Sequence, residues 1–175
     1  MPPSAGTLPT TGPVFIGLLF AVAFFGERRS FYPGRARWRP YVYALALGVC
    51  CAKLGEAEAL GEAGIQSLHI TSPVVTPQAI ARLVALNGKI DALRVVADNL
   101  DNVDALAAAT KAAGQSLDVV VDVDPGIRRT GVASPEAAVA LAQRIAAAPS
   151  LRFAGVQYYC GAQQHIESFK DRRAA

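Results

Sequence analysis

Cysteine, charge and long hydrophobic runs are all scarce in this sequence of 175 residues. Its three cysteines, Cys50, Cys51 and Cys160, lack the spacing of a metal site, and we expect small reduced residues buried in strands of a cytoplasmic protein. Charged residues make up 18% of the chain, and the net charge of +3 comes without any nucleic-acid-binding motif. The composition therefore argues against a metalloprotein and against a nucleic-acid partner.

The first forty residues differ in character from the rest, because they combine scattered prolines with the apolar run Val14–Phe25. This run is shorter than the roughly 20 residues of a membrane-spanning helix. Its length suits a signal peptide, but no Lys or Arg precedes it, and Arg28 and Arg29 follow it. We expect no membrane anchor and regard residues 1–43 as an atypical N-terminal segment that is either disordered or not native to the fold, with a signal peptide as the alternative.

From residue 44 onward, short apolar runs alternate with Ala- and Leu-rich segments of helical length. Nearly continuous apolar runs of this kind are typical of strands that are buried on both faces. The expected strands are Leu45–Cys51, Ser67–Thr71, Leu93–Ala97, Leu117–Val123 and Phe153–Tyr158, and the expected helices are Gly55–Ala63, Pro77–Leu86, Asn102–Ala113 and Pro135–Ala147.

Capping residues support this division. Thr76-Pro77 and Ser134-Pro135 each place an N-cap residue before a proline at the first helical position, and Gly64 and Gly114 follow helix ends. Alternation of strand and helix predicts a parallel α/β sheet with about five βα units. A closed TIM-type barrel needs eight strands, so the pattern predicts either a small open sheet or an incomplete (β/α) barrel over residues 44–175.

Four ordered motifs distinguish these two folds. They are Cys50–Leu60, Thr71–Val75, Val121–Val132, and Leu151–Gly161 with Gln164–Ile166 close behind. In this order and spacing they resemble the family of D-threonine aldolase, 3-hydroxy-D-aspartate aldolase and D-serine dehydratase, which has an alanine-racemase-like N-terminal barrel that binds pyridoxal 5'-phosphate (PLP). The resemblance covers about residues 44–169 and implies the incomplete barrel.

The resemblance also suggests cofactor-binding residues. Arg129 matches the family arginine beside the phenolic oxygen of PLP, and Tyr159 matches a tyrosine near the PLP ring. His165 matches a less uniform position, where it would line the site or carry a proton. Each has a plainer alternative: a surface arginine, a packed aromatic residue and an exposed loop histidine. Arg128 departs from the family, which usually has a small residue there.

The family's Schiff-base lysine has no counterpart in this chain. It lies in a motif Arg-Pro-His-x-Lys, and this chain has Arg39-Pro40-Tyr41-Val42-Tyr43, so that Tyr43 takes the lysine position. The resemblance therefore predicts no catalytic residue here. The family's later barrel strands and C-terminal domain, with its divalent-metal ligands, also have no match, and a damaged or frameshifted gene would explain both features.

The expected function is that of a remnant or fragment of a PLP-dependent lyase of D-3-hydroxy amino acids, inactive as this chain. Two alternatives are a half-barrel that holds PLP non-covalently or needs a partner, as a complementary fragment or homo-oligomer, and an enzyme with Lys53 as a relocated Schiff base. The motifs favour an aldolase but leave dehydratase and racemase open.

Overall fold

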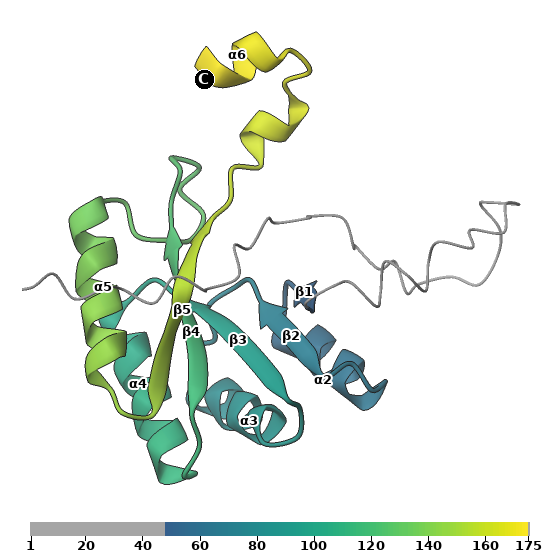
Figure 1. Cartoon of the computed structure of the whole chain (residues 1–175), viewed down its shortest axis with the longest axis vertical. Coiled ribbons are helices and arrows are strands. Elements are labelled where there is room, and N and C mark those ends of the chain that lie inside the picture. The colour runs from purple at the N-terminus through teal and green to yellow at the C-terminus, as the bar shows by residue number, and fades with distance from the viewer. Residues whose placement is uncertain (1–47, 175) are drawn as a thin grey trace, which may run out of the picture. The chain divides into compact units, whose positions relative to one another are not determined.

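The computed structural model describes residues 48–174, which form a parallel sheet with the strand order β1-β2-β3-β4-β5 (Figure 1). Each strand pairs with the next one along the chain, as right-handed βα units require. The elements are β1 (Val49–Cys51), α2 (Leu54–Glu62), β2 (Ser67–Ile70), α3 (Pro77–Asn87), β3 (Ala92–Ala97), α4 (Leu100–Ala112), β4 (Leu117–Val123), α5 (Pro135–Ala147), β5 (Leu151–Tyr158), the 3₁₀ helix η1 (Ala162–His165) and α6 (Phe169–Ala174).

The predicted elements are all present within the described residues. β4 and α5 have the expected bounds, whereas the helix expected from Asn102 begins at Leu100. The Asn99 side chain accepts a hydrogen bond from Asp101 N and so starts this helix earlier than the apolar periodicity indicated. The predictions missed η1 and α6, which bury no residue.

The capping predictions are confirmed. The hydroxyl oxygens of Thr76 and Ser134 accept hydrogen bonds from the backbone three residues ahead, and each helix has proline in its first turn. Gly64 and Gly114 adopt the left-handed conformation just past α2 and α4, with φ of 91° and 64°. These residues fix where the helices begin and end, and hence the lengths of the connecting loops.

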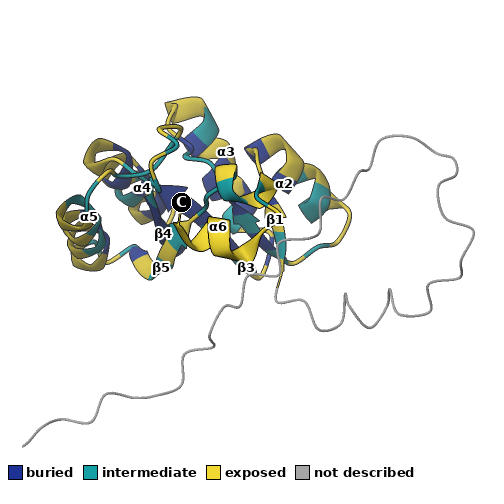
Figure 2. Cartoon of the chain, turned by 90° about the horizontal axis from the view of Figure 1, so that it is seen from above, coloured by how far each residue is buried: buried dark blue, intermediate teal, exposed yellow. Residues whose placement is uncertain are grey.

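The hydrophobic core lies between the sheet and helices α2 to α5 (Figure 2). Alternate strand residues, such as Leu68, Ile70, Val119 and Val121, are fully buried against those helices. Burying an aliphatic side chain of this size contributes about 1.5–3 kcal/mol relative to leaving it exposed. This layer therefore supplies most of the stability of the described residues.

The opposite face of the sheet carries a row of polar residues. Backbone register places Cys50, His69, Arg94, Asp118 and Arg152 side by side across the five strands. Cys51 is buried as predicted, and burial raises the pKa of its thiol to about 11. The same prediction was wrong for Cys50, which is exposed because it belongs to this polar row.

Several predictions concern residues outside the described range. They include the character of residues 1–43, the run Val14–Phe25, the beginning of the strand Leu45–Cys51, and the sequence Arg39–Tyr43. Within residues 48–174, none of the helices has both the length and the apolar composition needed to cross a membrane.

Candidate functional site

Two aspartates shape the loop that follows β4. The Asp124 carboxylate accepts hydrogen bonds from the backbone N–H groups of Gly126, at 2.9 Å, and Arg128, at 3.0 Å. Asp98, just after β3, accepts from Gly131 N at 3.0 Å. Both ends of the loop 124–131 are thus anchored at the carboxyl edge of the sheet, the edge at which enzymes of the (β/α) barrel type place their functional groups.

The loop bends sharply at two residues. Gly131 has φ of 99°, and a Cβ added there would lie 2.5 Å from Asp124 N, so a side chain is excluded. Arg128 has φ of 53° and occupies the left-handed region without being glycine. Arg128, which stands where the family usually has a small residue, is therefore a strained backbone position next to Arg129.

Arg129 and Tyr159, both predicted site residues, lie together. The guanidinium carbon of Arg129 is 5.4 Å from the centroid of the Tyr159 ring, within cation–π range. Tyr159 is half-buried just after β5, and its hydroxyl donates a long hydrogen bond of 3.5 Å to Gln164 Oε1. The loop after β4 and the end of β5 therefore combine a cation and an aromatic ring at one edge of the sheet.

His165, the third predicted site residue, is exposed at the end of η1. Its position follows Tyr159 closely along the chain, but no contact joins it to Arg129 or Tyr159. The structure therefore brings together two of the three predicted residues. The cofactor-binding role of all three stays a prediction.

A polar network that the sequence did not predict lies on the face of the sheet opposite helices α2 to α5, which is called the concave face below. Gln157 Nε2 donates to Asp122 Oδ1 at 2.9 Å and to the carbonyl oxygen of Thr71 at 3.3 Å, and Gln157 Oε1 lies 3.1 Å from His69 Nε2. Asp122 is only 3% exposed. His69 Nδ1 and Asp122 Oδ2 are buried without a hydrogen-bond partner within the described residues.

Burial of His69 lowers the pKa of its imidazole, because the charged form loses water. The hydrogen bond to Gln157 and the negative charge of Asp122 act in the opposite direction, and Arg94 adds to the lowering. A histidine within a strand is more often a core residue with both ring nitrogens hydrogen-bonded, and His69 fits this only in part, since Nδ1 lacks a partner within the described residues. Asp122, near the end of the mostly apolar run Leu117–Val123, was the available sequence signal for a polar network.

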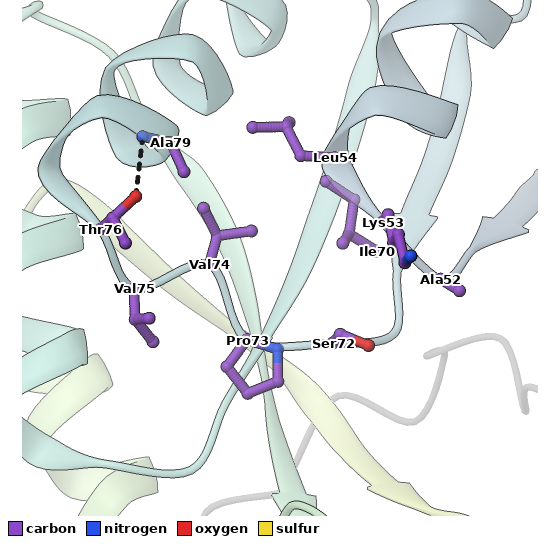
Figure 3. Close-up of a pocket in the computed structure, with 10 residues that line it drawn as sticks. All are labelled: Ala52, Lys53, Leu54, Ile70, Ser72, Pro73, Val74, Val75, Thr76 and Ala79. Carbon is purple, nitrogen blue, oxygen red and sulfur yellow. Dashed lines mark hydrogen bonds between the residues drawn. The ribbon is translucent and has the colours of Figure 1, made fainter.

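A pocket of about 250 Å³ opens where β1 and β2 end and α2 and α3 begin (Figure 3). Its wall is mostly apolar, and Lys53, Ser72 and Thr76 supply its polar groups. Lys53 is exposed at the start of α2. Within residues 48–174, no group of three or more His, Cys, Asp or Glu side chains is arranged to hold a metal ion.

Known proteins resemble this chain in sequence and in fold. Residues 37–173 match the family model described as alanine racemase, N-terminal domain. The chain is 42% identical over 129 residues to a 3-hydroxy-D-aspartate aldolase of Paracoccus denitrificans (strain Pd 1222), covering 74% of this chain and 33% of that protein. It is 39% identical over 127 residues to a D-threonine aldolase of an Arthrobacter species, covering 73% and 33%.

A solved structure gives the same result. The crystal structure of D-threonine aldolase from Filomicrobium marinum superposes with a TM-score of 0.73 and 35% sequence identity, covering 78% of this chain and 37% of that one. The predicted α/β fold and the predicted family are thereby confirmed. The chain spans about a third of the length of the relatives it matches.

Proposed function

Because the chain belongs to the alanine racemase N-terminal domain family, we propose that it forms part of the barrel of a PLP-dependent lyase that acts on D-3-hydroxy amino acids. The 42% identity to a 3-hydroxy-D-aspartate aldolase and the 39% identity to a D-threonine aldolase support this substrate class. An aldolase is proposed in preference to a dehydratase or a racemase for the same reason.

One observation carries the proposal: the Arg129 guanidinium lies over the Tyr159 ring at the carboxyl edge of the sheet. A planar pyridine ring with a phenolic oxygen and a phosphate suits such a site, because the tyrosine offers an aromatic face and the arginine offers fixed hydrogen-bond donors. The loop 124–131 supports the fit, since a side chain at Gly131 would collide with the backbone of Asp124.

PLP supplies the electron-withdrawing ring that such lyases require. The proposed work of this chain is to bind and orient that ring. Arg129 would donate hydrogen bonds to the phenolic oxygen, and Tyr159 would offer its aromatic ring to the cofactor. His165 ends the 3₁₀ helix η1, shortly after Tyr159 in the chain. It is the proposed polar group at the entrance of the PLP site.

Covalent attachment is the missing step. By resemblance, Tyr43 takes the place of the family lysine, and a phenol cannot form a Schiff base. The family match begins at residue 37 and therefore includes Tyr43. We propose that the chain holds PLP non-covalently and is inactive as a lyase.

The test is equilibrium titration of the purified chain with PLP, followed by absorbance. Arg129→Gln should raise the Kd about fivefold to tenfold, which corresponds to the ~1–1.4 kcal/mol of a cation–π contact and a charge-assisted hydrogen bond. Arg144→Gln is the matched control, because Arg144 is an exposed arginine on α5 that pairs with Asp104. Equal affinity of Arg129→Gln and the wild-type chain would contradict the proposed site.

A second candidate function is that of a half-barrel that needs a partner chain. The exposed apolar side chains on the helix-facing side of β5 favour it. Phe153, Val156 and Tyr158 are 46%, 58% and 67% exposed there, although Val119 and Val121, the β4 partners of Phe153 and Val156, are fully buried. A complementary chain that adds further βα units would cover this row. Light scattering of the pure chain should then show a monomer that associates only when a C-terminal barrel segment of a relative is added.

A further inference from the structure

Gln157 uses both N–H groups and the oxygen of its side-chain amide. Both N–H groups have acceptors, Asp122 Oδ1 and the Thr71 carbonyl, and the amide oxygen faces His69 Nε2. The reverse orientation would place the amide oxygen against a carboxylate and a carbonyl, which is repulsive. The amide orientation is therefore fixed, and His69 must donate from Nε2 while Nδ1 carries no proton.

Two of these contacts, to His69 and Thr71, connect β5 with β2, strands that backbone hydrogen bonds do not join. Gln157 lies on β5, Asp122 on the neighbouring β4, and His69 and Thr71 at the end of β2, with β3 and β4 between. The backbone ladder fixes only the neighbours of each strand. The distance across the concave face between β2 and β5 is therefore fixed by this side chain.

Both ends of this connection lead directly to the candidate site. Tyr159 comes two residues after Gln157 in the chain, and Thr71 immediately precedes the segment Ser72–Thr76 that lines the pocket. We propose that Gln157 is a positioning residue, which sets the place of Tyr159 relative to the pocket by holding Thr71, Asp122 and His69 across the concave face. This inference goes beyond the proposed function, and its main test requires no cofactor.

The test is NMR spectroscopy of the full chain, in which His69 and His165 are the only histidines. Long-range ¹H–¹⁵N spectra should show His69 as the single Nε2–H tautomer and the exposed His165 as the usual mixture. Gln157→Met keeps the volume of the side chain and removes all three hydrogen bonds. It should release the His69 tautomer and shift the Tyr159 ring resonances.

Ser150→Ala is the matched structural control. Ser150 precedes the amino end of β5, where its hydroxyl hydrogen-bonds with Thr110 Oγ1 and the Ala107 carbonyl. Ser150→Ala removes part-buried hydrogen bonds at the opposite end of the same strand. It should leave the His69 tautomer and the Tyr159 ring resonances unchanged. Gln157→Leu, which also removes all three hydrogen bonds and places no oxygen against Asp122, should give the same two changes and serves if Gln157→Met does not fold.

Three results would overturn the inference: an Nδ1–H tautomer in the wild-type chain, an unmoved Tyr159 in folded Gln157 variants, or an equal shift in Ser150→Ala. Failure of the wild-type chain to bind PLP would instead overturn the proposed function and leave these signals informative. Where PLP does bind, Gln157→Met should raise its Kd several-fold and Ser150→Ala should not.

Discussion

His69 Nε2 on β2 lies 3.1 Å from Gln157 Oε1 on β5, within hydrogen-bond distance, although two strands lie between them. In register, His69 stands level with Arg152, and Gln157 lies further along β5. Only a sheet that curves and staggers, as the wall of a barrel does, brings these two side chains together. This contact therefore gives a physical reason for the match to a barrel family.

Stability should fall when the pH drops below about 6.5, because the folded chain lowers the pKa of His69 from its usual value of 6.5 mainly by burial. The unfolded chain takes up the proton first, so acid favours unfolding until the lowered folded pKa is passed. The loss cannot exceed about 1.4 kcal/mol per pH unit for one group. Urea unfolding at pH 7.5 and 5.5 measures it.

The control for this pH effect is His165→Asn, which should retain the difference in unfolding free energy between the two pH values. His69→Gln should reduce it. An equal pH dependence in His69→Gln and the wild-type chain would show that other groups cause the effect.

Gly131→Ala should destabilise the chain by about 2–4 kcal/mol, because the new Cβ would meet the Asp124 backbone and the residue has φ of 99°. Gly55→Ala is the matched control: Gly55 lies in α2, and no atom lies within 4 Å of an added Cβ. It should be neutral or should stabilise the helix by up to about 1 kcal/mol. Thermal unfolding of both variants decides, and equal melting temperatures would refute the tight loop.

Arg128→Gly should stabilise the chain by about 0.5–1 kcal/mol. Glycine adopts the left-handed conformation at φ of 53° without the strain that a side chain causes there. The loss of this strain outweighs the conformational entropy that glycine adds to the unfolded chain. Arg128→Ala removes the same charge and keeps the strain, so it should show no such gain. Chemical denaturation compares the two, and a more stable Arg128→Ala would argue against strain at this residue.

Most of the fold followed from local sequence signals. Proline after Thr76 and Ser134 marked two helix starts, and the nearly continuous apolar run Leu117–Val123 marked an interior strand correctly to the residue. Where the signal was a side-chain cap with weak periodicity, as at Asn99, the predicted helix start was two residues late. Local rules work where one residue dictates the backbone of the next few.

The site was predictable only in part, because its geometry depends on contacts between distant residues. Motif resemblance named Arg129 and Tyr159, and their proximity became visible only in three dimensions. No local pattern indicates that Gln157 reaches His69, since this contact exists only once the sheet has curved. The roles of Arg129, Tyr159 and His165 toward a cofactor remain predictions.

The central claim is that the chain has the family's binding site for the PLP ring but lacks the Schiff-base lysine. Its most direct test is borohydride reduction of the chain mixed with PLP, followed by peptide mass mapping. We expect no lysine of the wild-type chain to be labelled specifically by PLP, and we expect labelling at position 43 in Tyr43→Lys. Specific labelling of Lys53 in the wild-type chain, at the edge of the pocket between β1 and β2, would contradict it and identify a relocated Schiff base.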